Sequence, residues 1–321
     1  VSNWGGRRPS EGELTAESSG TPVLVDERGV ARSGTVGRVD LELGAMVAEI
    51  ATGLHPSDLW LDAEAGRLYV ANANSDTVGM IDVSDGAFQE RSEISVRPDP
   101  DLLFGSASNA LALSPDGATL YVANGGNNAV AVVALNENRD GGEVIGFVPA
   151  AWYPGGLAVG ADGSLFVANV KGLGSRLEPA DPAKGRSVYA YLGTVQKVEP
   201  PDAQTLARFT AQVVEDARVP QALRAWEREQ VRADVAPKPV PDRLGEPSVF
   251  EHVVYVIKEN RTYDQVFGDL AQGDGDPNLC IFGREVTPNH HALAEQFVLL
   301  DNFYCNGVLS ADGHSWATEG N

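Results

Sequence analysis

Glu259 and Asn260 are the residues whose types and position most clearly suggest chemistry. They follow Val253–Ile257, a continuous apolar run of the kind that forms a strand buried on both faces of a parallel sheet. In open α/β sheets, ligands bind just beyond the carboxyl ends of the strands, where these two residues would lie. A carboxylate and an amide oxygen are hard ligands suited to a divalent cation. The pattern therefore predicts a metal site at the end of this strand.

A structural interpretation of the same residues needs no metal. Glu259 and Arg261 would form a surface ion pair, and Asn260 would cap a helix starting near Thr262. A Glu-Asn pair is too short a signal to separate the two interpretations.

Further elements downstream would complete the unit that positions this pair. Thr287 is expected to cap a helix with Pro288 in its first turn, and Val298–Leu300 to form a second strand. Strand, helix, helix and strand are consistent with a right-handed α/β crossover. His290 and His291 are adjacent, so they point in different directions on a helix, and a helix-start or packing role is favoured over a shared metal.

The string VVYVIKENRTYDQVFGD resembles the opening motif of a bacterial phosphoesterase family. That family includes phospholipase C and acid phosphatases, and belongs to the alkaline phosphatase superfamily. The resemblance implies that Glu259 and Asn260 are metal ligands, and that Arg261, Tyr263 and Asp264 brace the turn.

The same resemblance implies a Ser or Thr nucleophile after the second strand, in CNGVLSADGHSWATEG. Ser310 is the first candidate, with Ser315 and Thr318 behind it, because phospholipase C members surround their nucleophile with prolines that are missing here. A metal beside the hydroxyl would favour the alkoxide and a phospho-serine intermediate. His314 is expected to contact phosphate or act as an acid; a loop histidine bonded to backbone is the alternative. Since the later Asp and His ligands of a two-metal site are not visible, the 321-residue chain alone is expected to be inactive.

Repeated segments occupy the first 200 residues. LYVAN begins at Leu68 and Leu120 and LFVAN at Leu165, which gives periods of 52 and 45 residues. Alternating apolar residues and tight turns such as Asp116-Gly117 predict four short antiparallel strands per repeat, as in a propeller blade. Residues 34–200 resemble the YVTN family of bacterial β-propellers. Only about three blades are visible, so the chain is expected to lack earlier blades and to leave an open edge near its N-terminus.

The pattern changes after Pro201. Asp202 can cap a helix with Leu206, Phe209 and Val213 on one face, and residues 236–247 form a proline-rich linker. The predicted fold is multidomain: a partial all-β propeller of four-stranded antiparallel blades over residues 1–200, a helical connector and linker over 201–248, and an incomplete α/β sandwich over 249–321.

Charge and composition limit the partners. The net charge of −21, from 45 acidic and 24 basic residues, argues against nucleic acid and anionic membranes. An anionic substrate would need a local positive centre, which a bound metal supplies. No apolar run approaches 18 residues, so no transmembrane segment is predicted. Cys280 and Cys305 lack the spacing of a zinc site and would form either one disulfide or two free thiols.

These observations and resemblances predict a metal-dependent hydrolase of phosphate esters with an accessory propeller. The metal could be calcium, magnesium, manganese or zinc. A phosphomonoester, phosphodiester or phospholipid would each be compatible as substrate. The alternative is a non-catalytic scaffold that binds a protein partner on the propeller face. Resemblance favours a periplasmic or secreted location, although residues 1–20 do not resemble a signal peptide.

Overall fold

The computed structural model describes residues 1–172 except 19 and 28, residues 193–227, 232, 234–243 and 245–301, and residues 303, 313 and 317. These residues fall into two compact units, one within residues 1–230 and one within residues 231–321. None of the helices in the described part of the chain is long and apolar enough to cross a membrane.

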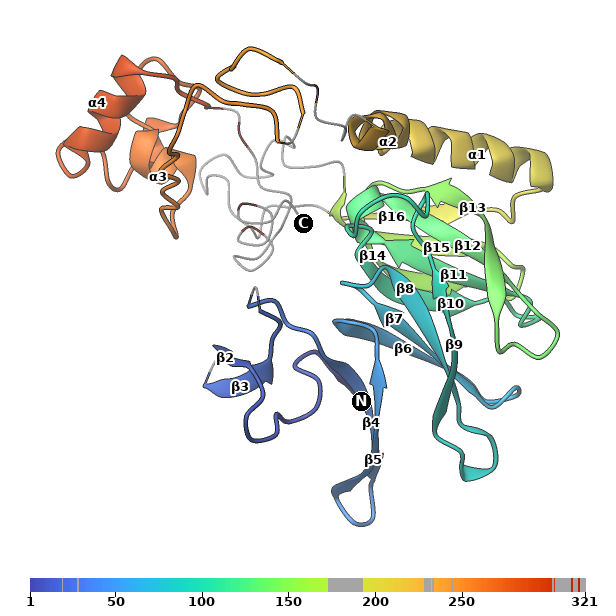
Figure 1. Ribbon diagram of the computed structural model, residues 1–321. Helices are drawn as coiled ribbons and strands as arrows, with labels where there is room; N and C mark the ends of the chain where they lie inside the picture. Colours follow the sequence, from blue (N-terminus) through green and yellow to red (C-terminus); the bar gives the residue numbers. More distant parts are fainter. Residues whose placement is uncertain are drawn as a thin grey trace. The chain divides into compact units, whose positions relative to one another are not determined.

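Antiparallel sheets follow one another along the first unit (Figure 1). Short alternating strands joined by tight turns fold each repeat into a meander, in which chain order equals order in the sheet. The first complete blade holds β6 (Pro56–Asp62), β7 (Arg67–Asn72), β8 (Thr77–Asp82) and β9 (Gln89–Ser95). The second holds β10 (Ser108–Leu113), β11 (Thr119–Asn124), β12 (Ala129–Leu135) and β13 (Gly142–Pro149). A third sheet has three described strands, β14 (Trp152–Val159), β15 (Leu165–Gly172) and β16 (Thr194–Val198). The predicted propeller-like blades are therefore confirmed.

Two smaller sheets precede the blades. One has the order β1 (Ser2–Asn3), β4 (Gly34–Asp40), β5 (Ala45–Thr52), and the other is the hairpin of β2 (Thr15–Ser18) and β3 (Thr21–Leu24). Short 3₁₀ helices lie at η1 (Ser84–Gly86), η2 (Gly125–Asn127) and, in the second unit, η5 (Pro277–Leu279).

The core of the first unit lies between the blades. Because a blade packs against neighbours on both faces, its middle strands are apolar on both sides and lose their alternation. Tyr69, Val70 and Ala71 in β7 are fully buried, and so are Leu120 and Val122 in β11. The repeated LYVAN motif is thus the second strand of each blade.

Helices α1 (Ala203–Asp216) and α2 (Val219–Glu227) follow β16. The Asp202 carboxylate caps α1 by accepting from the Thr205 N–H at 2.7 Å, as the sequence predicts. The Thr210 hydroxyl of α1 accepts from the Phe147 N–H of β13 at 2.9 Å. Since α1 is packed onto a blade, the predicted helical connector is not confirmed.

The second unit contains α3 (Tyr263–Phe267) and α4 (Pro288–Gln296). Thr287 is the N-cap residue of α4 and Pro288 its first residue, as predicted. Thr262, and not Asn260, occupies the N-cap of α3, where its N–H donates to Gln265 Oε1 at 3.1 Å.

The strands predicted for the second unit are absent from its described residues. Val253–Ile257 has no regular secondary structure, and its side chains are 42–86% exposed. Residues 298–300 are likewise irregular. An apolar run becomes a strand only beside another strand that pairs its backbone groups, and the described part of this unit supplies none. The predicted α/β sandwich is therefore not confirmed.

His291 forms the small core of the second unit. Its side chain is fully buried, with Nε2 at 2.8 Å from Asp269 Oδ1 and Nδ1 at 2.9 Å from the Thr287 carbonyl oxygen. The Phe267 ring lies 5.3 Å away in an edge-on arrangement. The packing role predicted for this histidine is confirmed.

Candidate functional site

The first strands of the blades, β6, β10 and β14, begin at one face of the propeller unit. Ser57 Oγ donates to the Ser108 carbonyl oxygen at 3.0 Å, and the Leu111 N–H donates to Asp58 Oδ2 at 2.8 Å, so β6 and β10 are neighbours. Bonds between the strand starts and the loops after the second strands close this face. The Ala73 N–H donates to the His55 carbonyl oxygen, and the Gly125 N–H to that of Ala107.

One residue at the start of each first strand has a left-handed backbone. His55, Ala107 and Tyr153 have φ values of 54°, 52° and 59°, which is uncommon for residues with a side chain. They occupy equivalent positions in three successive repeats, so the fold imposes this conformation on them. The turn lets the chain enter the blade sharply and directs three different side chains to corresponding places.

Side-chain acceptors hold two of these turns, one of them buried and one half-buried. Asp76 is fully buried, and its carboxylate accepts from the N–H groups of Gly105, Ser106 and Ala107 at 2.8–3.0 Å. Burial raises the pKa of the Asp76 carboxyl, and the three donors offset part of that effect. The Asn128 side chain, at the equivalent position of the next repeat, accepts from the Tyr153 N–H at 2.8 Å.

Aromatic and basic groups gather at these strand starts. The rings of Trp4 and His55 lie 4.0 Å apart. The Lys171 ammonium lies 5.6 Å from the ring centre of Tyr153 and 5.9 Å from that of Trp152. Trp4 and Trp152 are 60% and 43% exposed, which leaves apolar surface for a ligand.

Asn109 adds a polar group beside Tyr153. A Cβ atom on Gly125 would lie 2.6 Å from Asn109 Nδ2 and 2.9 Å from Tyr153 Cζ, so both side chains lie close to this glycine. Both amide atoms of Asn109 are buried without a hydrogen-bond partner among the described residues. An unpartnered buried amide is costly, and a bound ligand or water would relieve that cost.

These two groups, Trp4 with His55 at the start of β6 and Asn109, Tyr153 and Lys171 around the start of β14, were not predicted from the sequence. A signal was present: aligning the repeats at LYVAN, with a one-residue gap in the shorter turn of the third repeat, places LHPSD, SASNA and WYPGG in register, and the second position holds His, Ala or Tyr. A position that varies in chemistry within a regular repeat is a candidate for function.

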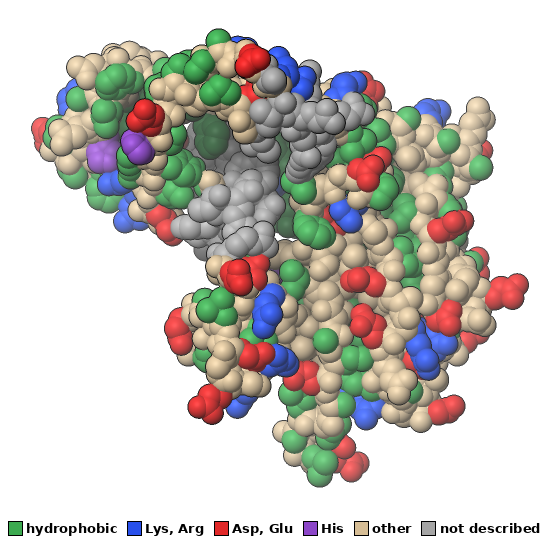
Figure 2. Space-filling view, viewed as in Figure 1, with side chains coloured by type: hydrophobic (Ala, Val, Ile, Leu, Met, Phe, Trp, Pro, Cys, Tyr) green, Lys and Arg blue, Asp and Glu red, His purple; other side chains and the backbone are tan. Residues whose placement is uncertain are grey.

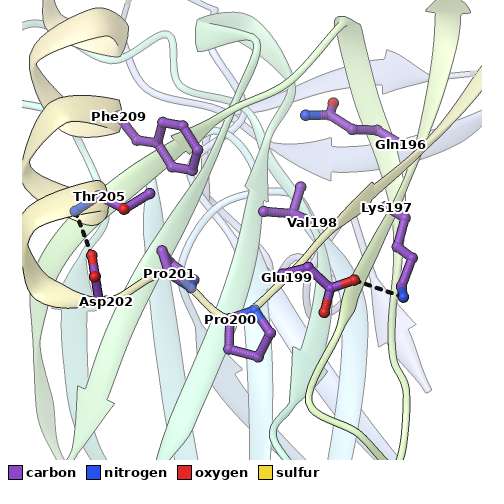
Figure 3. A pocket seen from close by; sticks show the side chains of 9 residues that line it. All are labelled: Gln196, Lys197, Val198, Glu199, Pro200, Pro201, Asp202, Thr205 and Phe209. Atoms are coloured by element: carbon purple, nitrogen blue, oxygen red, sulfur yellow. Dashed lines mark hydrogen bonds and ion pairs between the residues drawn. The ribbon is translucent and has the colours of Figure 1, made fainter.

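A separate cleft of about 520 Å³ lies between β16 and α1 (Figure 3). Its side chains include the Lys197–Glu199 ion pair at 2.7 Å and the helix cap Asp202. These charges are paired with each other or with backbone, and no histidine or cysteine lines the cleft. The cleft therefore lacks a set of groups for acid, base or nucleophilic catalysis.

The predicted metal ligands lie in the second unit. Glu259 and Asn260 follow the irregular, exposed segment 253–257 and do not end a strand of a sheet. The Arg261 guanidinium donates to the Asn260 carbonyl oxygen at 2.7 Å and lies over the Phe282 ring. Within the described ranges, no three His, Cys, Asp or Glu side chains come together as a metal site. Ser310, His314, Ser315 and Thr318 lie outside the described residues, so their predicted roles stay predictions.

Several solved structures are similar to parts of this chain at low identity and low TM-score. Kuenenia stuttgartiensis hydrazine synthase is 23% identical with a TM-score of 0.38, and the match covers 52% of this chain and 40% of that one. The Pseudomonas aeruginosa periplasmic gluconolactonase is 18% identical with a TM-score of 0.36, and the match covers 46% of this chain and 46% of that one. The β-propeller domain of Myceliophteria thermophila Cps50 (Swd1) is 14% identical with a TM-score of 0.34, and the match covers 43% of this chain and 43% of that one. The matched part is thus less than half the length of each of these three chains, and the three names share no single function. None of the curated proteins matches the sequence.

A family model corrects the predicted chemistry. Residues 47–172 match the family described as "Lactonase, 7-bladed beta-propeller". That match overturns the prediction of a metal-dependent phosphate-ester hydrolase, and it gives no better support to the scaffold alternative. No comparison supports the YVTN or phosphoesterase resemblance. From within β5 to the end of β15, the chain is therefore similar to the lactonase seven-bladed β-propeller family.

Proposed function

We propose that the protein acts on ester bonds as a lactone hydrolase, at the face where β6, β10 and β14 begin. The observation that carries this proposal is the match of residues 47–172 to a lactonase propeller family. Two groups of side chains support it: Trp4 with His55 at the start of β6, and Asn109, Tyr153 and Lys171 around the start of β14.

Hydrolysis of a lactone needs a base for water and donors for the carbonyl oxygen. The His55 imidazole takes a proton as the water oxygen adds to the carbonyl carbon. The Lys171 ammonium and the Tyr153 hydroxyl stabilise the negative charge that develops on the carbonyl oxygen. The ring carbon–oxygen bond then breaks, the proton passes to the departing oxygen, and a hydroxy acid is released.

The substrate class follows from the same surface. Exposed Trp4 and Trp152 offer flat apolar faces to a small ring, and the Asn109 amide offers both a donor and an acceptor to ring hydroxyls. A sugar-derived lactone combines these features. A periplasmic or secreted location is part of the proposal.

The proposal is tested with glucono-δ-lactone as substrate. Acid release reports ring opening, and the rate with the protein is compared with the uncatalysed rate. We expect His55→Gln to lower the rate by about 10²-fold, the usual contribution of a general base. His290→Gln, a histidine of the second unit, is the matched control and should act as wild type. Equal rates for wild type and His55→Gln would contradict the proposed role.

Binding gives a readout that does not depend on turnover. A lactam analogue, which cannot be hydrolysed at a comparable rate, should shift the NMR amide signals of His55, Asn109 and Tyr153. Shifts confined to the cleft between β16 and α1 would place the ligand elsewhere.

A further inference from the structure

Trp4 lies in a tight turn that follows β1. The Gly6 N–H donates to the Asn3 carbonyl oxygen at 3.2 Å, and Asn3 Nδ2 donates to the Gly6 carbonyl oxygen at 2.6 Å, so Asn3 closes the turn twice. Before the turn, β1 pairs with β4, and Asn3 stands opposite Thr35 in that ladder. The backbone that carries Trp4 is therefore held both by the ladder and by the bonds within the turn.

Gly5 and Gly6 let this turn approach neighbouring residues closely. A Cβ atom on Gly5 would lie 3.2 Å from Val23 Cγ1, and one on Gly6 would lie 2.0 Å from Ser33 Oγ. Gly6 also has a φ of 68°, which residues with a side chain rarely adopt. The turn is thus seated against β3 and the residue before β4, and a side chain at position 6 would displace it.

The His55 imidazole needs a support that its backbone does not give. The His55 carbonyl oxygen accepts from the Ala73 N–H at 3.0 Å, and this bond holds the backbone at the entry to β6. The bond between Cβ and the ring nevertheless rotates in a broad, roughly two-fold energy well. A general base works only when its nitrogen faces the proton that it accepts. Ring orientation is therefore a separate requirement for catalysis.

Contact with the indole of Trp4 meets this requirement. The centres of the Trp4 and His55 rings lie 4.0 Å apart, and their planes are inclined by 40°. Paired aromatic rings favour particular relative orientations and stabilise each other beyond the area that they bury, so the indole limits the orientations of the imidazole. Trp4 is 60% exposed, so burial in a core does not account for its position.

We propose that Trp4 is the positioning residue of His55. The turn of residues 3–6 holds the indole, and the indole holds the imidazole in the orientation in which it accepts a proton from water. The effect on rate rests on the proposed function, whereas the effect on ring orientation does not. Trp4→Ala should let the imidazole rotate and lower kcat for glucono-δ-lactone about tenfold, and Trp4→Phe should keep kcat within about twofold of wild type, because it retains an aromatic face.

The ring protons of His55 report the contact without any substrate, because the ring current of an indole shifts the NMR signals of protons beside it. These signals should move in Trp4→Ala. Unchanged His55 signals would overturn the proposal, whether or not the wild type hydrolyses a lactone. Moved signals with an unchanged kcat would also overturn it, because ring orientation would then not affect the rate. Moved signals in a wild type without turnover would contradict the proposed function and support the role of Trp4 in orienting the ring.

A substitution in the turn tests whether the turn holds the indole. Gly6→Ala places a Cβ against Ser33, so the His55 signals should shift and kcat should fall although both rings are retained. Gly12→Ala is the matched control, because Gly12 has a φ of 85° and a Cβ there would meet no atom within 4 Å. It introduces comparable backbone strain without the clash and should leave signals and rate unchanged. Identical His55 signals in Gly6→Ala and Gly12→Ala would overturn the proposal.

Discussion

At the scale of single residues, side-chain acceptors hold the segments that join the blades. Asp76 satisfies three N–H groups of the segment that leads into β10, and Asn128 satisfies one at the start of β14. Each lies in the loop after the second strand of one blade and braces the entry to the next. These side chains therefore hold the turns that present Ala107 and Tyr153 at the candidate site.

We expect Asp76→Ala to destabilise the propeller unit by about 3 kcal/mol, because it leaves three N–H groups without their acceptor. Urea unfolding followed by tryptophan fluorescence measures the change. Asp101→Ala, at an exposed aspartate of the same loop region, is the control and should change stability by less than about 0.5 kcal/mol. Equal effects of the two substitutions would show that the Asp76 contacts contribute little.

At the scale of elements, close backbone approach fixes α1 on the second complete blade. A Cβ atom on Gly146 of β13 would lie 2.7 Å from both Leu206 Cγ and Thr210 Oγ1 of α1. Only glycine leaves room for the helix at this distance, and the contact brings the Thr210 hydroxyl to the Phe147 N–H. The helix that lines the cleft beside β16 thus depends on one glycine of a neighbouring strand.

We expect Gly146→Ala to cost about 1–3 kcal/mol of folding stability, as overpacking usually does. Gly156→Ala is the matched control, since a Cβ there would meet Ala168 at an ordinary 3.5 Å. Urea unfolding of both variants checks the difference. A neutral Gly146→Ala would mean that α1 shifts at little cost.

The contact between Asp269, which follows α3, and His291 of α4 depends on pH. The Arg284 N–H and the His291 ring lower the pKa of the Asp269 carboxyl from its ordinary 3.8 to about 2. A lowered folded-state pKa means that the carboxylate stabilises the folded unit above about pH 4, and that this contribution is lost as pH falls toward 2.

Asp269→Asn should therefore flatten the loss of stability between pH 4 and pH 2. Hydrogen exchange of the α4 amides in that window measures it, and Asp274→Asn, an exposed neighbour, is the control. The same steep loss in wild type and Asp269→Asn would show that another group titrates.

At the scale of the whole chain, charge sets which partners can approach. Acidic side chains are spread over the face shown in Figure 2 rather than gathered in one patch. With a net charge of −21, the chain repels polyanions, and no described element carries a basic stripe. A neutral lactone meets no such barrier.

We expect no binding of a double-stranded oligonucleotide in fluorescence anisotropy, even at 50 mM salt, where such binding is strongest. Thermal stability should rise as salt is added up to about 0.15 M, because screening weakens repulsion among the excess carboxylates. A salt-sensitive complex with the oligonucleotide would contradict this view of the surface.

Parts of the fold were predictable because their signals are local. The LYVAN repeats, the Asp202 cap of α1 and the Thr287 start of α4 each depend on a few adjacent residues, and all three appear as expected. The candidate site was not predictable in this way. His55 and Tyr153 are far apart in sequence and reach equivalent places at the starts of β6 and β14 only because successive blades repeat the same turn.

The sequence alone determined the blade as the repeating unit, since alternation and tight turns are properties of neighbouring residues. It could not determine whether Val253–Ile257 becomes a strand, because that requires a partner strand and the described residues provide none. Tertiary structure also decided that α1 packs on β13 and that, among the described strands, β16 pairs with β15. Both depend on which backbone groups find a partner across the fold, and pairing between distant segments is not encoded in any one of them.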